Sequence, residues 1–169
     1  MRAKLIIEGK EFDIDIFDPE LQKIVTPKKQ TGYENVGTGH VYYYVNDYGE
    51  IKNLDHDDFD DDTKYDIGNY YSNYEVAKNN ARADRLMRQL RRFAVEHREN
   101  DIDWQNEHRT VCSIEYDDRV GVLNFETRTC HWCRTLGVIY FDSEETTKLA
   151  MDIFHDELIW YFTEYKDNL

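Results

Sequence analysis

Hydrophobic and polar residues alternate in several short segments of the chain, which is the pattern of β-strands with one buried face. The alternation on both sides of Gly9-Lys10 predicts an N-terminal hairpin, and Pro19 predicts a short helix after it, both within residues 1–31. A run of three tyrosines between Val41 and Val45 predicts the next strand. Residues 108–141 then predict a three-stranded segment, with strands at 109–116, 120–127 and 136–141.

Two longer segments have the periodicity of amphipathic helices. In residues 73–98 the apolar side chains share one helical face, and the opposite face carries Lys78, Arg82, Arg85, Arg88 and Arg92. Residues 143–166 form the second helix. There Glu157 falls inside the apolar face, so it either contacts an arginine or marks the point where that face opens to solvent. The aspartate-rich residues 47–66 predict an acidic loop.

These elements predict a single α+β domain over residues 1–169, in which two main helices pack on an antiparallel sheet. With 40% hydrophobic and 14% aromatic residues, the chain has enough apolar mass for one core. No internal repeat is visible in the sequence. Neither a signal peptide nor a membrane span is expected, because no apolar run is long enough for either. The expected location is therefore the cytoplasm.

Acidic and basic residues are segregated along this chain, whose formal net charge is −14. Residues 47–66 carry nine acidic and two basic residues, whereas residues 75–99 carry seven basic and four acidic residues. An acidic surface repels nucleic acid and steers a protein toward basic clefts of other proteins. The charge pattern therefore predicts binding to a basic protein rather than to nucleic acid.

The partner-binding surface is predicted from the aspartate-rich segment and from two tyrosines that follow it. Closely spaced carboxylates can mimic DNA phosphates in the basic channel of a nucleic-acid enzyme, although a solvated acidic loop has the same sequence. A calcium loop is disfavoured, because Thr63 replaces its glycine and Asn69 its bidentate glutamate. Tyrosine beside aspartate suits a protein interface, with a half-buried sheet face as the alternative. The predicted partner-binding residues are Asp55, Asp57, Asp58, Asp60, Asp61, Asp62, Tyr70 and Tyr71.

The basic face of the helix at 73–98 has two interpretations. Arg82, Arg85, Arg88 and Arg92 can contact phosphates, which would make this a DNA- or RNA-binding helix. The same side chains can instead form ion pairs with the acidic segments of this chain or with a second subunit in a homodimer. The net charge of −14 favours the ion pairs.

Cys130-His131-Trp132-Cys133 is the motif of this chain that most suggests chemistry. Two cysteines at this spacing can bind tetrahedral zinc, and Cys112 and His108, four residues apart on a predicted strand, can complete the ligand set. Two surface thiols on a hairpin are the alternative. Because the chain has three cysteines, a secreted disulfide framework is not expected. Zinc is the cofactor that the sequence predicts.

Several further motifs mark turns, a helix entry, a core tryptophan and a strand end. They are Gly32-Tyr33-Glu34-Asn35-Val36 ahead of Tyr42-Tyr43-Tyr44, Gly68-Asn69-Tyr70-Tyr71-Ser72, Ile102-Asp103-Trp104 and Ile139-Tyr140-Phe141-Asp142-Ser143. Through them nearly the whole chain resembles a family of small accessory proteins encoded by phages, prophages and mobile elements of Gram-positive bacteria. The resemblance implies a genomic context and no enzymatic activity. By analogy with other small acidic proteins of such elements, it suggests an inhibitor of host defence, such as an anti-CRISPR protein.

No catalytic motif supports an enzyme, since the sequence has no glycine-rich phosphate loop, nucleophile elbow or His-Glu-x-x-His. The leading prediction is a phage or mobile-element protein that binds a host defence nuclease, a CRISPR effector first of all, and blocks its nucleic-acid loading or activation. One alternative is a DNA- or RNA-associated regulatory protein that uses the arginine helix. Another is a zinc-stabilised structural adaptor.

Overall fold

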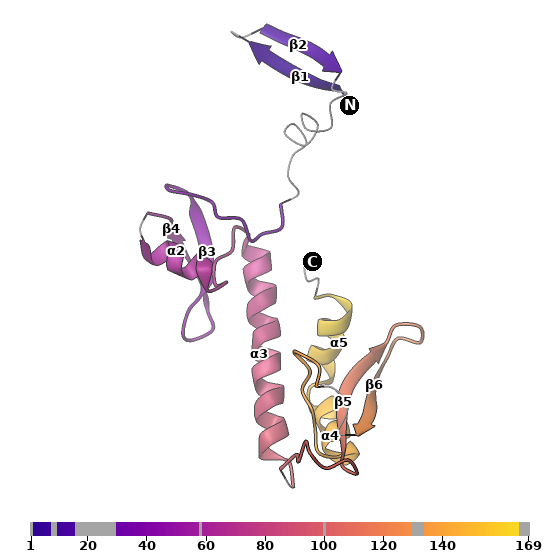
Figure 1. Cartoon of the computed structure of the whole chain (residues 1–169). Coiled ribbons are helices and arrows are strands. Elements are labelled where there is room, and N and C mark those ends of the chain that lie inside the picture. The colour runs from indigo at the N-terminus through magenta and orange to yellow at the C-terminus, as the bar shows by residue number, and fades with distance from the viewer. Residues whose placement is uncertain are drawn as a thin grey trace. The chain divides into compact units, whose positions relative to one another are not determined.

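The computed structural model describes residues 2–7, 10–15, 30–57, 59–99, 101–129 and 134–165 (Figure 1). Contacts within the chain divide it into two compact units, residues 1–31 and 32–169, where the sequence predicts one domain. The first unit contains the predicted hairpin, in which β1 (Arg2–Ile7) pairs antiparallel with β2 (Lys10–Asp15). The short helix predicted after this hairpin lies outside the described residues.

The second unit has mixed α and β content, which confirms the α+β class. Its strands pair antiparallel, as expected, but in two separate hairpins, β3 with β4 and β5 with β6. The elements are, in chain order, β3 (Val41–Val45), β4 (Ile51–Asp55), α2 (Phe59–Asp66), α3 (Tyr74–Glu96), β5 (Thr110–Asp117), β6 (Val122–Thr129), α4 (Glu144–Ile153) and α5 (His155–Thr163).

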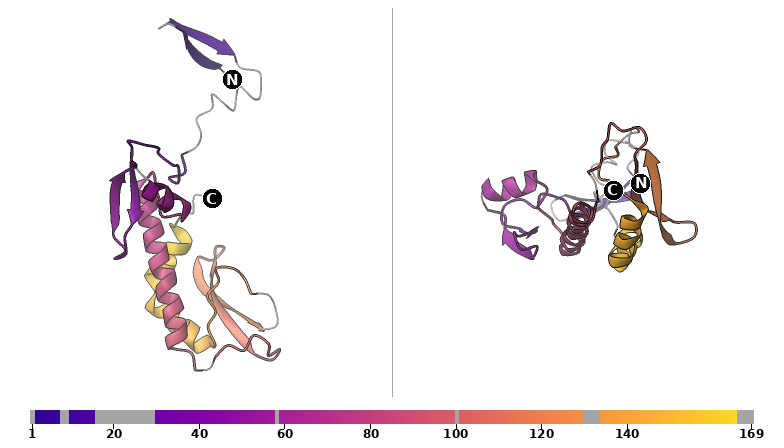
Figure 2. Two further views of the ribbon diagram at one scale, coloured as in Figure 1. Left: turned by 60° about the vertical axis from the view of Figure 1, so that its left-hand side comes forward. Right: turned by 90° about the horizontal axis from the view of Figure 1, so that it is seen from below.

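Helix α3 lies between the β3–β4 hairpin on one side and α4 and α5 on the other (Figure 2). Asn73 caps its N-terminus, because its side chain accepts hydrogen bonds from the backbone amides of Glu75 and Val76. The apolar face of α3 is buried, as its periodicity predicts. The core cluster of this unit comprises Leu86, Leu90, Phe93, Ala94, Phe141, Ala150 and Leu158.

The acidic segment 47–66 is not a loop. It contains a turn, strand β4 and helix α2. Asp60, Asp61 and Asp62 occupy the first turn of α2, where the partial positive charge of the helix N-terminus favours carboxylates. Aspartate has a low propensity for the interior of a helix, so a run of aspartates looks like a loop. The loop prediction is wrong because aspartate is favoured at the beginning of a helix, where this run lies.

Two other predicted elements are shorter than expected. The third strand of residues 108–141 is reduced to one bridge, in which Cys112 and Phe141 exchange backbone hydrogen bonds of 3.0 and 2.8 Å. The helix predicted at 143–166 is divided at Phe154 into α4 and α5. The ring of Phe154 meets that of Phe93 edge-on at 5.7 Å, so the division places an aromatic side chain against the core.

The second unit contains an internal repeat that the sequence does not reveal. In each copy a hairpin is followed by a segment that returns to its first strand, makes one antiparallel bridge and enters a capped helix. Tyr71 bridges to Tyr43 before α3, and 70 residues later Phe141 bridges to Cys112 before α4. The bridging pairs differ in side chain, but in both copies an aromatic bridging residue is followed two positions later by the residue that caps the helix, Asn73 or Ser143.

Candidate functional site

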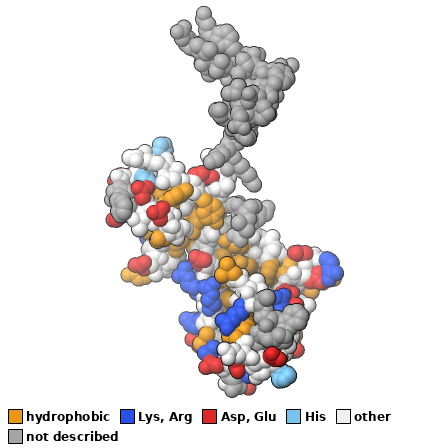
Figure 3. Space-filling model, viewed as in Figure 1, with side chains coloured by type: hydrophobic (Ala, Val, Ile, Leu, Met, Phe, Trp, Pro, Cys, Tyr) orange, Lys and Arg blue, Asp and Glu red, His pale blue; other side chains and the backbone are white. Residues whose placement is uncertain are grey.

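Exposed carboxylates gather on β4 and α2, and Figure 3 shows acidic side chains over this part of the second unit. Of the predicted partner-binding residues, Asp55, Asp57, Asp60 and Asp62 are exposed. Asp58 lies outside the described residues. The exposed members of the predicted acidic surface therefore come from the end of β4, from α2 and, for Asp57, from the connection between them.

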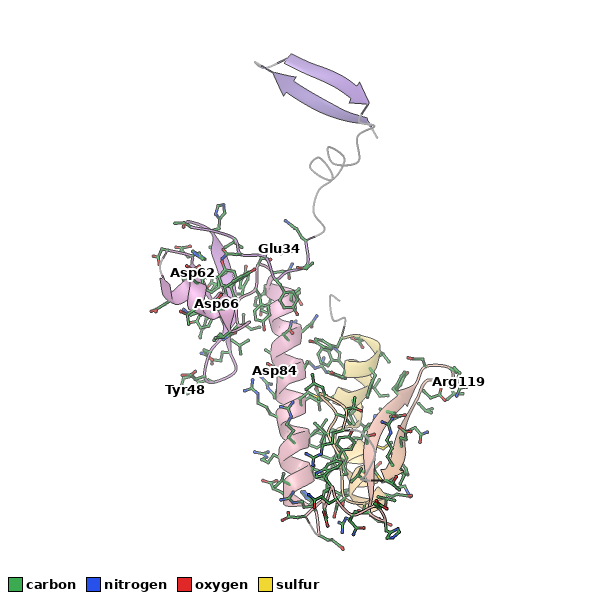
Figure 4. All side chains as sticks on the ribbon, in the orientation of Figure 1. Glu34, Tyr48, Asp62, Asp66, Asp84 and Arg119 are labelled. Carbon is green, nitrogen blue, oxygen red and sulfur yellow. The ribbon has the colours of Figure 1, made fainter. Side chains whose placement is uncertain are left out.

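One face of α2 combines carboxylates with an aromatic ring. Tyr65 and Asp66 follow Asp62 by three and four residues, so both neighbour it on the same side of the helix, and all three are exposed. Figure 4 labels Asp62 and Asp66. We call these three residues the α2 stripe. The Tyr65 ring meets that of Tyr70 edge-on at 5.4 Å, yet 41% of Tyr65 stays exposed. Sequence analysis missed Tyr65 and Asp66 because a segment predicted as a loop has no helical faces to compare.

Three residues predicted to bind a partner are buried instead: Asp61, Tyr70 and Tyr71. One carboxylate oxygen of Asp61 accepts a hydrogen bond from the Tyr42 hydroxyl, and the other accepts one of 2.8 Å from the backbone N–H of Asp57. Tyr70 stacks on Tyr42 with ring centroids 4.1 Å apart. Asp61 and Tyr70 join α2 to β3, so they support the acidic surface from inside and do not form part of it. Tyr71 makes a backbone bridge to Tyr43, and its ring lies 5.6 Å from that of Tyr33.

Burial also changes the acidity of these tyrosines. Burial first, and the hydrogen bond to Asp61 second, raise the pKa of Tyr42 far above its ordinary value. Burial likewise raises the pKa of Tyr70, and it raises the pKa of Tyr71 to about 12. All three phenols therefore stay neutral at physiological pH, which excludes them as anionic contacts for a basic partner.

Two of the predicted arginines form ion pairs on the exposed face of α3, but with residues of the same helix and not with an acidic segment as predicted. Arg88 pairs with Asp84 at 3.6 Å, and Arg92 pairs with Glu96 at 3.8 Å. Both pairs join residues one helical turn apart and are well exposed, so each contributes only about 0.3–0.5 kcal/mol. Among the described residues Arg85 makes no ion pair. The fourth predicted residue, Arg82, has a different kind of partner.

Arg82 explains the position of Glu157 inside the apolar face of the last helix. It donates hydrogen bonds from Nε and Nη2 to the two carboxylate oxygens of Glu157, at 2.8 and 3.1 Å. Its guanidinium also lies over the ring of Trp160, 3.9 Å from the centroid. Glu157 therefore contacts an arginine, which is one of the two outcomes that the sequence predicts, and the pair joins α3 to α5.

The predicted zinc ligands are only partly described. Cys130 and Cys133 lie outside the described residues. Cys112 is buried in β5 with its Sγ 3.5 Å from Thr127 Oγ1, and His108 is exposed before the strand begins, so the two do not share a strand face as expected. Within the described part of the chain, no three His, Cys, Asp or Glu side chains are grouped to hold a metal ion. Zinc bound by Cys130 and Cys133 stays a prediction.

No known protein family, curated protein or solved structure matches this chain. Among the helices of the described residues, none is long and apolar enough to cross a membrane.

Proposed function

We propose that this chain is an inhibitor encoded by a phage or mobile element, and that it binds a host defence nuclease through its acidic surface. The observation that carries the proposal is the unequal pairing of charges in the second unit. Arg82, Arg88 and Arg92 of α3 contact carboxylates of the same chain. The carboxylates of the α2 stripe, in contrast, have no lysine or arginine partner among the described residues, and their one charged neighbour is His56, 3.6 Å from Asp62. The complementary surface is a basic nucleic-acid channel. A CRISPR effector is the first partner to test.

The pairing of the arginines favours a protein partner over nucleic acid. Nucleic-acid binding gains most of its affinity from several uncompensated cations that replace counterions on phosphates. Of the arginines on α3, Arg85 and Arg91 make no ion pair with the described residues. A phosphate backbone would also have to approach a chain of net charge −14, which attracts a basic protein instead.

The composition of the α2 stripe suits a protein interface. Tyrosine is enriched at the centres of interfaces, where its ring is desolvated, and carboxylates around it speed association and fix orientation. Asp62 and Asp66 are one helical turn apart, about 6 Å along the helix axis. Two successive nucleotides of a DNA strand advance about 7 Å along the axis of the duplex. The spacing supports the form of the proposal in which these carboxylates mimic phosphates.

The two parts of the proposal have separate support. The mode of binding rests on the charges and exposure of the described residues. The inhibitory role rests on the resemblance of the sequence to accessory proteins of phages and mobile elements. A basic partner that is not a defence nuclease would keep the first part and overturn the second.

The test measures DNA cleavage by purified, guide-loaded CRISPR effectors as a function of the concentration of this chain. The variant Asp62→Asn with Asp66→Asn removes two charges from the α2 stripe. The control variant, Asp152→Asn with Glu164→Gln, removes two charges from exposed positions of α4 and of the residue after α5.

We expect the unchanged chain to inhibit cleavage, and the concentration for half inhibition to rise at least about tenfold in the α2 variant but not in the control. Equal inhibition by the two variants would remove the α2 stripe from the interface. Absence of binding to every effector of a panel that covers the known types would overturn the choice of partner.

A further inference from the structure

A groove runs between α3, the β3–β4 hairpin and the beginning of α5, with a volume of about 550 Å³. Small-ligand sites usually have volumes of roughly 300–1,000 Å³. The groove is lined by Ile51, Lys78, Arg82, Arg85, Phe154 and Glu157, among others. None of its lining residues belongs to the α2 stripe, so this site is distinct from the surface of the proposed function.

Positive charge predominates in the groove, although the chain as a whole is acidic. Three cationic side chains line it against one carboxylate, that of Glu157. Arg82 neutralises this carboxylate through two hydrogen bonds, and Trp160 below its guanidinium fixes it in place. Lys78 lies 3.5 Å from the exposed Glu75. Arg85 makes no ion pair with the described residues, so its guanidinium is available to an anion.

Apolar side chains line the groove beside these cations. Ile51 comes from β4, Phe154 from the junction of α4 and α5, and Leu86 from the core face of α3. The space-filling view shows basic side chains over α3 next to hydrophobic ones (Figure 3). A site of this kind provides burial for an apolar body and a planar fork of donors for a carboxylate.

We infer that the groove binds a small amphipathic carboxylate, with its head at Arg85 and its apolar body against Ile51 and Phe154. Other ligand classes fit less well. A nucleoside diphosphate or triphosphate brings several phosphates, for which the groove offers one arginine without an ion pair among the described residues. A neutral apolar molecule would cover that guanidinium without giving it a hydrogen-bond partner, which costs free energy.

The test uses octanoate as the probe, kept below its micelle concentration and added to the full chain. Calorimetry measures affinity, and backbone amide shifts in nuclear magnetic resonance spectra locate the site. Octanol lacks the charge of octanoate and acetate lacks its apolar body. We expect saturable binding of octanoate, with shifts centred on Ile51, Arg85 and Phe154, and at least about tenfold weaker binding of octanol and acetate.

Two arginine variants separate a specific contact from the loss of net charge. Arg85 and Arg91 are both exposed on α3 and neither has an ion pair with the described residues, but Arg91 does not line the groove. We expect Arg85→Ala to weaken octanoate binding at least about tenfold and Arg91→Ala to leave it unchanged. Arg85→Lys should retain part of the affinity, because it keeps the charge but loses the planar fork. Circular dichroism spectra are the check that each variant is folded.

Four results would overturn the inference. They are equal effects of Arg85→Ala and Arg91→Ala, equal affinities for octanol and octanoate, the absence of saturable octanoate binding, and amide shifts centred elsewhere. The alternative site for octanoate is a smaller apolar cavity of about 180 Å³, which is lined by Leu90, Ile139 and Phe162 among others. Shifts centred on those residues would show that octanoate binds there through its chain alone.

Discussion

Arg82 of α3 holds Glu157 of α5 by two hydrogen bonds while its guanidinium lies 3.9 Å from the ring centroid of Trp160. A charge pair and an aromatic contact thus join two helices, through an arginine and a glutamate that are 75 residues apart in the sequence. The side chains of Arg82 and Glu157 are 40% and 42% exposed, so solvent screens much of their attraction. The contact with Trp160 adds to the pair because the ring shields one face of the cation.

From this geometry we predict that Arg82→Ala lowers the free energy of unfolding by about 1–1.5 kcal/mol, from the lost pair and the lost contact with the ring. Glu157→Gln should cost about 0.5 kcal/mol, because it removes the charge and leaves the arginine on Trp160. Urea denaturation measures both. Arg88→Ala is the control, since Arg88 has an exposed partner on its own helix. A loss for Arg82→Ala no larger than for Arg88→Ala would contradict the prediction.

Tyr42→Phe tests the contact that joins β3 to α2. It removes the hydroxyl that donates to the buried carboxylate of Asp61, and a buried acceptor that loses its donor costs about 1–3 kcal/mol. We expect a loss of about 2 kcal/mol in the free energy of unfolding, measured with urea. Tyr48→Phe is the control, because Tyr48 is 88% exposed in the turn between β3 and β4 (Figure 4). Equal stability of the two variants would show that water, or Lys64, whose Nζ lies 3.7 Å from the same carboxylate oxygen, takes the place of the lost donor.

Gly32→Ala tests the packing of the segment before β3 on α3. Gly32 has a φ of 90°, and a Cβ there would lie 2.5 Å from Cγ2 of Val76. Gly68 has a φ of 74° with open space around it, so Gly68→Ala adds backbone strain without a clash. We expect a loss of stability of about 1 kcal/mol for Gly68→Ala and about 2–4 kcal/mol for Gly32→Ala. Thermal unfolding measures the difference, which should shrink when Val76→Ala is added to Gly32→Ala. No shrinkage would assign the loss to the backbone instead.

The features that local periodicity specifies could be predicted from the sequence. The core face of α3 follows from apolar residues three and four positions apart, and the strand β3 follows from its run of tyrosines. The position of Glu157 within an apolar arc left two outcomes, a contact with an arginine or an opening of that face to solvent, and the structure shows the contact. In each case the information lies within one or two helical turns or one strand.

The features that depend on distant partners could not be predicted. All the aspartates of residues 55–62 look alike in the sequence, and the partner that joins the buried Asp61 to β3, the hydroxyl of Tyr42, lies 19 residues away. The third strand predicted before α4 is a single bridge, in which Phe141 pairs with Cys112, 29 residues earlier in the chain. The α2 stripe was missed for a local reason, since an aspartate-rich first turn has the composition of a loop.

Raised pH should unfold the second unit through its buried tyrosines. Folding raises the pKa of Tyr71 to about 12 and raises those of Tyr42 and Tyr70 as well, from an ordinary value near 10. The stability that depends on these neutral phenols is therefore complete below about pH 10 and is lost as the pH rises toward 12. We expect a constant melting temperature from pH 7 to about pH 9 and a steep fall above about pH 10. Tyr71→Phe should make that fall shallower. An unchanged slope would mean that Tyr71 titrates as an exposed phenol.

The ion pairs of α3 predict that this chain shifts neither labelled duplex nor single-stranded nucleic acid at near-physiological salt. Arg88 and Arg92 are engaged by Asp84 and Glu96, and the net charge of −14 repels phosphates. If pairing is the cause, Asp84→Asn with Glu96→Gln should release both arginines and produce weak binding in gel-shift assays, and this binding should fall steeply as salt rises. Neutralising Asp152 and Glu164 instead changes the net charge equally but frees no arginine of α3, so it should produce less binding. Sub-micromolar binding by the unchanged chain would overturn the proposed protein-binding function in favour of a nucleic-acid-associated regulator.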